Sequence, residues 1–498
     1  MKHSTGHALL LSSLFSLVSC VGSGTPRDDT HLNTVKAYCD TLIEHGRDTY
    51  GEKHTPLFAT CLDRKTHQLF PESEKDRLFQ IRMKHWENWG VRNSERCFTG
   101  ANPHKDQNLY QILYALTQAT GEESYAKEAD KTLEYFFNNL QSETTGLLAW
   151  GEHMGWSFRT DGVDFKPAAH NSTHEFGRAW VLWEKSFNLA PQACITFAHG
   201  LWDHQIADQT VGNFSRHAGY FEHKPELNSE YPRHGGFYIA TWAEAYRRTQ
   251  DPLFLKAINV LVAGFDRRRN AQSGAVPAES NKRSGGNMIW AGSNLSLAID
   301  TWDAAEKVPS DLARNLREFC SKTDAVYLNL KHEVRPGGRG FFMNGHLDTL
   351  EPFGQGVWGG HSGFWGMRGP ALLCYLRYQQ TKAAGYRDLV MGAAKLHLEA
   401  TLTRDDVRHP GDIGAEIWLM LNAHDITRDN RFLEKAAEFA SLGYELFLDD
   451  TSPLPKATTQ FDHYEAVTGG DSLMMALLEL WARKNGINKD LELTWNSR

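Results

Sequence analysis

The sequence lacks a long basic run, a CxxC pair and any apolar stretch long enough to cross a bilayer. It holds 53 Lys and Arg against 61 Asp and Glu, a net charge of −8. Without a basic surface, nucleic acid is not expected as a partner. Without CxxC spacing, a zinc ribbon or thiol redox motif is not indicated. The 498 residues, 41% hydrophobic and 23% charged, are typical of a globular protein with a large core.

The N-terminus carries an export signal. An apolar run, residues 8–18, follows Lys2 and His3 and is too short to span a membrane. It ends in Leu-Val-Ser-Cys, which looks like a bacterial lipobox with Cys20 as the lipidated residue; a plain signal peptide is the alternative. We expect an exported lipoprotein that meets the membrane only through its lipid anchor, and Val21 after the cysteine favours the outer membrane. The expected organisation is a signal peptide (1–20), a tether (21–30) and one catalytic domain (31–498).

Six cysteines remain after Cys20. Cys39, Cys61 and Cys97 lie close in sequence and are the ones most suited to pairing in an exported protein. Isolated buried thiols are the alternative for all six.

Helical periodicity dominates the rest of the chain, and alternating strand patterns are scarce. The predicted helices are His31–Tyr50, Glu74–Trp89, Gln107–Ala119, Glu123–Leu140, Thr173–Asn188, Pro191–Asp208, Gly235–Thr249, Pro252–Arg267, Asn287–Glu306, Leu312–Leu330, Pro370–Lys382, Arg387–Leu402, Ile413–Ala423, Asp429–Leu446 and Ser472–Lys484.

A similar turn recurs near residues 120, 250 and 427, where one helix ends and an acidic N-cap starts the next. Asp251 followed by Pro252 suits an N-cap and a first helical position. Helical hairpins of this kind cannot bury their apolar faces alone and must stack on one another. The prediction is all-α: an (α/α)6–7 toroid or barrel of helical hairpins, with an open solenoid as the alternative.

Residues 335–370 break this pattern with eleven glycines and are expected to form a loop. A loop of this length in a compact domain is usually functional. Its aromatic residues could stack on sugars and its arginines could hold carboxylates, unless the loop only covers a barrel mouth. These candidate substrate-binding residues are Arg335, Arg339, Trp358, Trp365 and Arg368.

The stretch from 151 to 217 holds His153, Glu175 and the pair Arg216–His217. Their gaps of 21 and 40 residues exclude a single helix face, so only the fold can bring them together. Two imidazoles and a carboxylate suit a borderline divalent cation. Each residue also has an ordinary structural interpretation, such as core packing or helix capping. Rival ligands are His170, His174 and His234, and nearby candidate substrate contacts are Trp156, Arg159, Tyr220 and Arg233.

The order and spacing of these residues resemble polysaccharide lyase family 2, the metal-dependent pectate lyases with an (α/α)7 toroid. The resemblance implies that His153, Glu175 and His217 hold a divalent metal and that Arg216 acts as the base. Mn²⁺ is the leading candidate for this metal, and Co, Ni, Ca and Zn are the alternatives. It also implies an acidic polysaccharide as partner: pectate or oligogalacturonate leads, and alginate, ulvan-like or glucuronan polymers remain open. Outside this stretch the resemblance extends to the helical architecture alone.

The expected chemistry is β-elimination. A base removes the proton on C5 of a uronate, and the adjacent carboxylate charge must be neutralised for the carbanion-like transition state to form. A guanidinium is normally protonated, so a base of this type and neutral ligand histidines both imply an alkaline optimum.

Two other classes of protein fit parts of the sequence. An (α/α) glycoside hydrolase would use a carboxylate pair, either Asp412 and Glu416 or Asp462 and Glu465. A lipid-anchored glycan-binding protein would use the aromatic residues, which include 15 Trp, but would not need the His/Glu/Arg-His set. A sugar epimerase with a similar barrel would use histidines without a metal.

Overall fold

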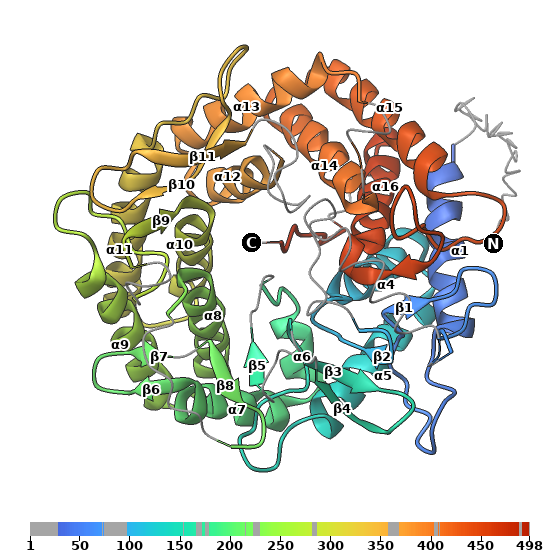
Figure 1. The fold of residues 1–498 in the computed structure, drawn as a ribbon, viewed down its shortest axis with the longest axis horizontal. Helices are drawn as coiled ribbons and strands as arrows, with labels where there is room; N and C mark the ends of the chain where they lie inside the picture. Colours follow the sequence, from blue (N-terminus) through green and yellow to red (C-terminus); the bar gives the residue numbers. More distant parts are fainter. Residues whose placement is uncertain are drawn as a thin grey trace, which may run out of the picture.

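The helices form a closed ring, seen end-on in the computed structural model of Figure 1. The structure describes residues 28–71, 73, 97–152, 154–165, 172–174, 179–214, 216–222, 230–280, 286–356, 368–402, 407, 409–487 and 491–497. Helices follow one another as antiparallel pairs, and the first helix packs on the last, which closes the ring. The all-α toroid predicted from the sequence is confirmed.

Within the described residues, seven helices form the inner wall and seven the outer wall. The inner helices are α4 (Gln107–Thr120), α6 (Trp183–Leu189), α8 (Pro232–Thr249), α10 (Ala291–Ala305), α12 (Arg368–Thr381), α14 (Pro410–Thr427) and α16 (Gly470–Lys484). The outer helices are α5 (Glu123–Asn139), α7 (Pro191–Gly200), α9 (Pro252–Arg268), α11 (Ser310–Asn329), α13 (Ala384–Leu398), α15 (Asn430–Phe447) and α1 (Thr30–His45).

The two walls bury different amounts of surface, as their sequences require. Every residue of α14 from Pro410 to Ala423 is buried, because this helix has neighbours on all sides. The outer helix α15 buries a single stripe, from Phe432 to Phe447, as an amphipathic helix does. Inner helices approach closely: a Cβ on Gly236 would lie 2.6 Å from the Asp300 carboxylate of α10.

The predicted turn with an acidic N-cap between paired helices is confirmed at two places. The Asp251 side chain accepts a hydrogen bond from the Leu253 amide at 2.8 Å, with Pro252 at the first helical position. Asp429 caps α15 in the same way through the Arg431 amide at 3.0 Å. These caps satisfy amide groups that a helix start leaves unpaired, so each helix begins where the sequence predicts it.

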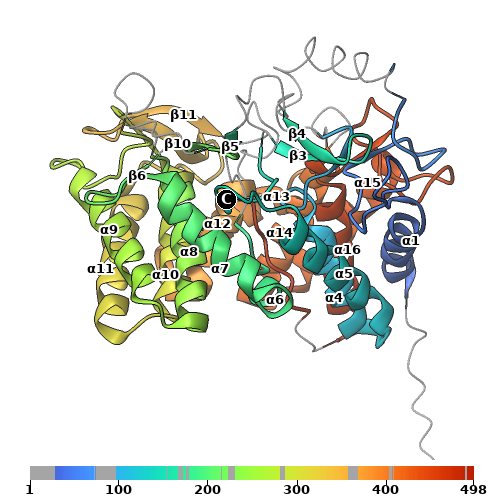
Figure 2. The same cartoon turned by 90° about the horizontal axis from the view of Figure 1, so that it is seen from below.

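Short strands collect at one end of the ring, the upper edge of Figure 2. They make small antiparallel sheets in the orders β1–β12, β2–β3–β4, β5–β8, β6–β7 and β11–β10–β9. Their bounds are β1 Cys61–Leu62, β2 Gly100–Ala101, β3 Met154–Ser157, β4 Gly162–Phe165, β5 Ser172–His174, β6 Ile206–Asp208, β7 Asn213–Phe214, β8 His217–Gly219, β9 Met288–Trp290, β10 Phe341–His346, β11 Pro352–Gly356 and β12 Tyr464–Glu465.

Four predictions of secondary structure are wrong in part. The helix predicted over Asn287–Glu306 includes strand β9 at Met288–Trp290, and α10 begins only at Ala291. The helix predicted over Thr173–Asn188 is a strand at 172–174, and α6 begins only at Trp183. The helix predicted over Pro191–Asp208 ends at Gly200 and passes through a π-turn into β6. Residues 335–370 are not simply loop, because β10 and β11 pair within them and α12 begins at Arg368. The helix predicted at 74–89 lies outside the described residues.

The hairpin of β10 and β11 forms because two buried aromatic residues anchor it while its glycines allow close strand contact. Phe341 and Phe342 are almost fully buried. A Cβ on Gly345 would lie 2.3 Å from the Glu351 carbonyl oxygen, so only glycine fits there.

The C-terminal segment runs inside the ring, as Figure 1 shows by the position of the C-terminus. Thr494 exchanges hydrogen bonds with the Gln111 side chain of α4, at 2.8 and 3.2 Å. Asn496 donates to the Asn108 side chain at 2.6 Å. The segment therefore occupies the centre of the ring and borders a cavity of about 890 Å³ at the end away from the strands.

All six described cysteines are buried and none forms a disulfide, so the alternative of isolated thiols holds and the pairing of Cys39, Cys61 and Cys97 is wrong. Within the described part of the chain, no helix has the length and apolar character needed to cross a membrane. The lipidation residue Cys20 and the signal segment lie outside the described residues.

Candidate functional site

The segments that carry the predicted metal ligands converge at the strand end of the ring. Strand β5 pairs with β8 so that His174 lies opposite His217, and β5 also contacts β3. His153 immediately precedes β3 and Glu175 immediately follows β5, but both residues lie outside the described part. The fold therefore brings the three segments together across gaps of 21 and 40 residues.

Arg216 immediately precedes β8, and its guanidinium stacks on an aromatic ring. The guanidinium carbon is 4.2 Å from the ring centroid of Tyr231, the residue that precedes α8. Arg233, in the first turn of α8, lies 6.0 Å from the same centroid. Trp290 packs edge-on against Tyr231 at 5.1 Å. Both guanidinium groups thus lie within 6.0 Å of the centre of one ring, and two cationic groups beside one ring suit an anionic ligand.

Two carboxylates, those of Glu230 and Glu279, are buried near these arginines. Glu230 immediately precedes Tyr231, and Glu279 immediately precedes Ser280. Glu230 accepts a hydrogen bond from the Ser280 hydroxyl, which links the segment before α8 to the segment before β9. Oε1 of each carboxylate is buried and has no hydrogen-bond partner among the described residues. Burial lowers the pKa of the nearby Arg268, and the Glu230 charge opposes that shift. Sequence reasoning missed both glutamates, because neither stands in a recognisable spacing.

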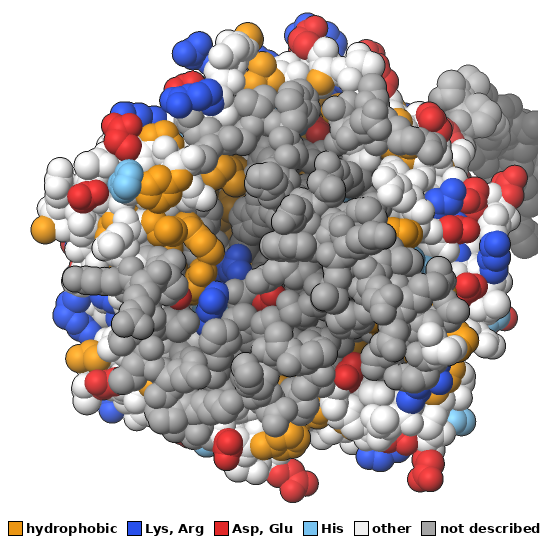
Figure 3. All heavy atoms as spheres, in the orientation of Figure 1, with side chains coloured by type: hydrophobic (Ala, Val, Ile, Leu, Met, Phe, Trp, Pro, Cys, Tyr) orange, Lys and Arg blue, Asp and Glu red, His pale blue; other side chains and the backbone are white. Residues whose placement is uncertain are grey.

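Figure 3 looks onto this end of the ring, where basic and acidic side chains lie beside hydrophobic ones in the central hollow. The 890 Å³ cavity is lined by residues of the inner helices α4, α6, α12, α14 and α16 and by residues 491–495. Among the predicted site residues whose side chains the structure describes, none lines it. This cavity and the described residues of the predicted site therefore lie at different places.

Other predicted substrate contacts near the strands have structural partners. The Tyr220 hydroxyl donates to the Leu140 carbonyl at 3.2 Å, and burial raises the pKa of Tyr220 to about 12. Arg159 donates to the Phe70 carbonyl at 2.8 Å. Trp156 is buried in β3. The geometry favours packing roles for Tyr220 and Trp156.

The arginines of the glycine-rich segment fall into two groups. Arg339 is exposed and pairs with Glu333, at 2.6 Å between Nη2 and Oε1, and the hydrogen bond lowers the pKa of Glu333 to about 2. Arg335 is also exposed, in the turn that precedes β10. Arg368 opens α12, and only its backbone is described. Trp358 and Trp365 lie outside the described residues.

Of the rival ligands, His234 is fully buried in α8, with its ring 5.8 Å from that of Tyr231. The backbone of His174 lies in β5, whereas His170 falls outside the described residues.

The carboxylates proposed for a hydrolase all have structural partners. Asp412 accepts a hydrogen bond from the His409 amide at 3.1 Å and completes a capping box on α14. Glu416 pairs with His397 at 2.6 Å in the buried contact between α13 and α14. Asp462 pairs with Arg64. Glu465 lies 3.0 Å from His463. These partners favour structural roles for all four carboxylates.

The architecture defined by the described residues is an (α/α)7 toroid with polar chemistry at its strand end. Residues 79–267 match a family model described as periplasmic pectate lyase, and the matched range includes His153, Glu175, Arg216 and His217. The chain is 25% identical over 220 residues to the pectate disaccharide-lyase of Dickeya dadantii (strain 3937), which is 43% of this chain and 36% of that protein. It thus spans about a third of the length of that relative.

Solved structures with a similar outline are more distant. Cellobiose 2-epimerase from Bacillus thermoamylovorans B4167 gives a TM-score of 0.49 at 11% identity, covering 92% of this chain and 100% of that chain. An unsaturated glucuronyl hydrolase specific for heparin gives 0.46 at 11% identity, covering 93% and 99%.

Proposed function

We propose that this protein is a polysaccharide lyase that cleaves a uronate-containing polysaccharide, pectate or oligogalacturonate first, by metal-assisted β-elimination. The observation that carries the proposal is the convergence of β3, β5 and β8, with Arg216 stacked on Tyr231 at that place. The match to the periplasmic pectate lyase model over the same stretch supports it.

The donor set proposed for the metal consists of His153, Glu175 and His217. Their types suit a borderline divalent cation, Mn²⁺ first, and the strands that adjoin them in sequence pack together. A cation bound there would offset the negative charge of the uronate carboxylate.

Arg216 would accept the proton from C5. As the C5–H bond breaks, a double bond forms between C4 and C5 and the C4–O bond breaks, so its electrons leave with the glycosidic oxygen. The face of Tyr231 stabilises a charged guanidinium and fixes its position. Proton acceptance needs the neutral form, so the proposed activity requires alkaline pH. Arg233, on the same ring, would bind a substrate carboxylate.

The proposed setting is the cell envelope. The description of the matched family as periplasmic is consistent with export. We propose a lipid anchor on Cys20 and an outer-membrane location, which palmitate labelling of the wild type and a Cys20→Ala variant would test. Loss of label in the variant is expected; equal labelling of both proteins would refute the anchor.

A panel of acidic polysaccharides tests the activity. Pectate, alginate, ulvan and glucuronan are each incubated with the protein at alkaline pH, with and without EDTA. Elimination produces an unsaturated uronate with ultraviolet absorbance, whereas hydrolysis produces reducing ends without it. New reducing ends without that absorbance would overturn the lyase assignment.

A further inference from the structure

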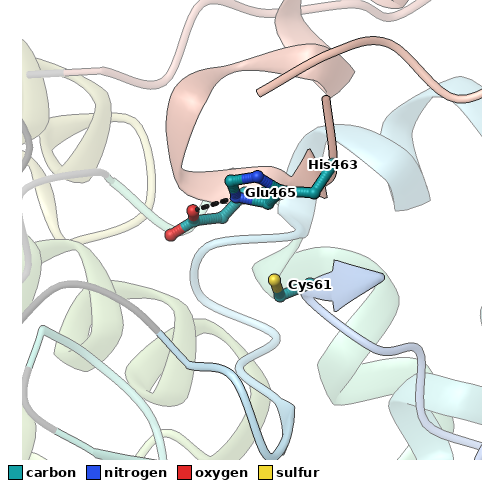
Figure 4. A group of neighbouring side chains, drawn as sticks. All are labelled: Cys61, His463 and Glu465. Carbon is teal, nitrogen blue, oxygen red and sulfur yellow. Dashed lines mark hydrogen bonds and ion pairs between the residues drawn. The ribbon is translucent and has the colours of Figure 1, made fainter. Parts of the chain in front are cut away.

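Three side chains with metal-binding groups meet where the beginning and the end of the chain pair. Cys61 of β1 lies directly opposite Glu465 of β12. His463 stands two residues before Glu465, and alternate residues of an extended chain share a face. Figure 4 shows the imidazole, the carboxylate and the sulfur gathered on one side of the two segments.

The three groups are close together and buried. The sulfur of Cys61, a ring nitrogen of His463 and a carboxylate oxygen of Glu465 all lie within 4.8 Å of one another. The shortest separation is 3.0 Å, between Nε2 of His463 and Oε2 of Glu465. Phe98 packs with Cys61, and Phe70 lies edge-on to His463 at 5.8 Å. The aromatic side chains make the surroundings apolar.

We propose that Cys61, His463 and Glu465 bind a divalent cation of the Zn²⁺ or Co²⁺ class. Tetrahedral Zn²⁺ with bonds of about 2.0–2.3 Å brings its ligand atoms to roughly 3.3–3.7 Å of each other. The ligand atoms lie within 4.8 Å of one another in the structure, so side-chain movements of about 1 Å would bring them to the separations that Zn²⁺ requires. A thiolate and a carboxylate carry two negative charges, which a divalent cation neutralises in this buried place.

The thiolate determines which metals the site prefers. Mg²⁺, Ca²⁺ and Mn²⁺ favour oxygen ligands, while a sulfur, nitrogen and oxygen set favours Zn²⁺ and its neighbours. This set also differs from the nitrogen and oxygen donors proposed for the elimination site, and it does not depend on that proposal. Binding would release the thiol proton, so affinity would fall at acid pH.

The position of the cluster gives the site a structural role. It joins residues about four hundred positions apart at the seam where the ring closes. The Ala466 amide donates to the Thr60 carbonyl at 2.8 Å beside it. Arg64, fully buried, donates to the Leu454 carbonyl at 2.6 Å across the same seam. A link between such distant residues restricts the unfolded chain more than a short link does.

Cobalt titration tests the proposal. The full chain is freed of metal with a chelator and titrated with Co²⁺, and the near-ultraviolet charge-transfer absorption of a Co²⁺–thiolate bond is followed. Wild type should develop this band and lose it when Zn²⁺ is added. Cys61→Ser should not develop it. The matched control is Cys320→Ser, which should keep the band. Cys320 is a buried thiol of the outer helix α11 and donates to the Ala298 carbonyl at 3.3 Å.

Thermal melting gives a second readout. Zn²⁺ should raise the Tm of wild type and of Cys320→Ser by several degrees more than that of Cys61→Ser, which keeps the donor set proposed for the elimination site. Where Cys61→Ser does not fold by circular dichroism, His463→Gln keeps the thiol and should raise the Kd for Co²⁺ at least tenfold. Absence of the band in wild type, or its persistence in Cys61→Ser, overturns the proposal. The donor set proposed for the elimination site contains no thiol, so chelator-sensitive lyase activity without the band would refute this site alone.

Discussion

Replacing Tyr231 by Leu should lower lyase activity without unfolding the protein. The ring of Tyr231 supports the Arg216 guanidinium at 4.2 Å and lies 6.0 Å from that of Arg233. Such contacts are worth about 0.5–2 kcal/mol. If that energy holds Arg216 in its reactive position, its loss lowers kcat/KM roughly 2- to 30-fold. Leucine keeps an apolar side chain against Trp290, so the substitution should disturb the position of Arg216 more than the packing around residue 231.

The assay is the initial rate of unsaturated product formation from pectate, with folding checked by circular dichroism. Tyr231→Phe is the matched control, because it keeps the ring face and should retain most of the activity. Equal kcat/KM for wild type and Tyr231→Leu would refute the reasoning, since Arg216 would then be positioned by other contacts. An equal fall in both variants would assign the effect to the hydroxyl.

Three further outcomes follow from the structure. Burial opposes ionisation of Glu244, but hydrogen bonds from Arg247 and Arg248 and the charge of Lys307 outweigh it and lower the pKa to about 2 from 4.5. Glu244→Gln should therefore cost about 1–2 kcal/mol of unfolding free energy near neutral pH, a figure reduced for the solvent exposure of the cations. That difference should shrink as pH falls from 4.5 towards 2; in urea titrations, a constant difference down to pH 3 would contradict it. Asp251→Ala should cost about 0.5–2 kcal/mol by removing the α9 cap, and an unchanged urea midpoint would argue against the cap. Glu416→Gln should lower Tm but preserve kcat in the folded protein, and selective loss of kcat would return this carboxylate to the catalytic candidates.

The helical architecture was predictable because its signals are local. Asp251 and Pro252 mark a helix start within two residues, and the stripe of α15 repeats with helical period. The same local signals predict a helix at Thr173, yet this residue pairs with Ala218 in the sheet of β5 and β8. That pairing joins residues some forty-five positions apart, and no local pattern contains it.

The candidate site, like the fold, could be predicted from the sequence only in part. Residue types and gaps predicted that His153, Glu175 and His217 share a site, and the adjoining strands do converge. The stacking of Arg216 on Tyr231 was not predicted, because the two residues belong to different elements. Cys61 with His463 and Glu465 was beyond sequence reasoning too, since the group forms only when the ring closes.

The most direct test of the central claim compares wild type with Arg216→Ala and Arg216→Lys on pectate at alkaline pH. Removing a general base typically lowers the rate roughly 10²- to 10⁴-fold, so both variants should lose that much of the unsaturated product signal. EDTA should abolish the wild-type signal, and added Mn²⁺ should restore it. Unsaturated product formed at the wild-type rate by Arg216→Ala, or by wild type in EDTA, would contradict metal-assisted elimination at this site.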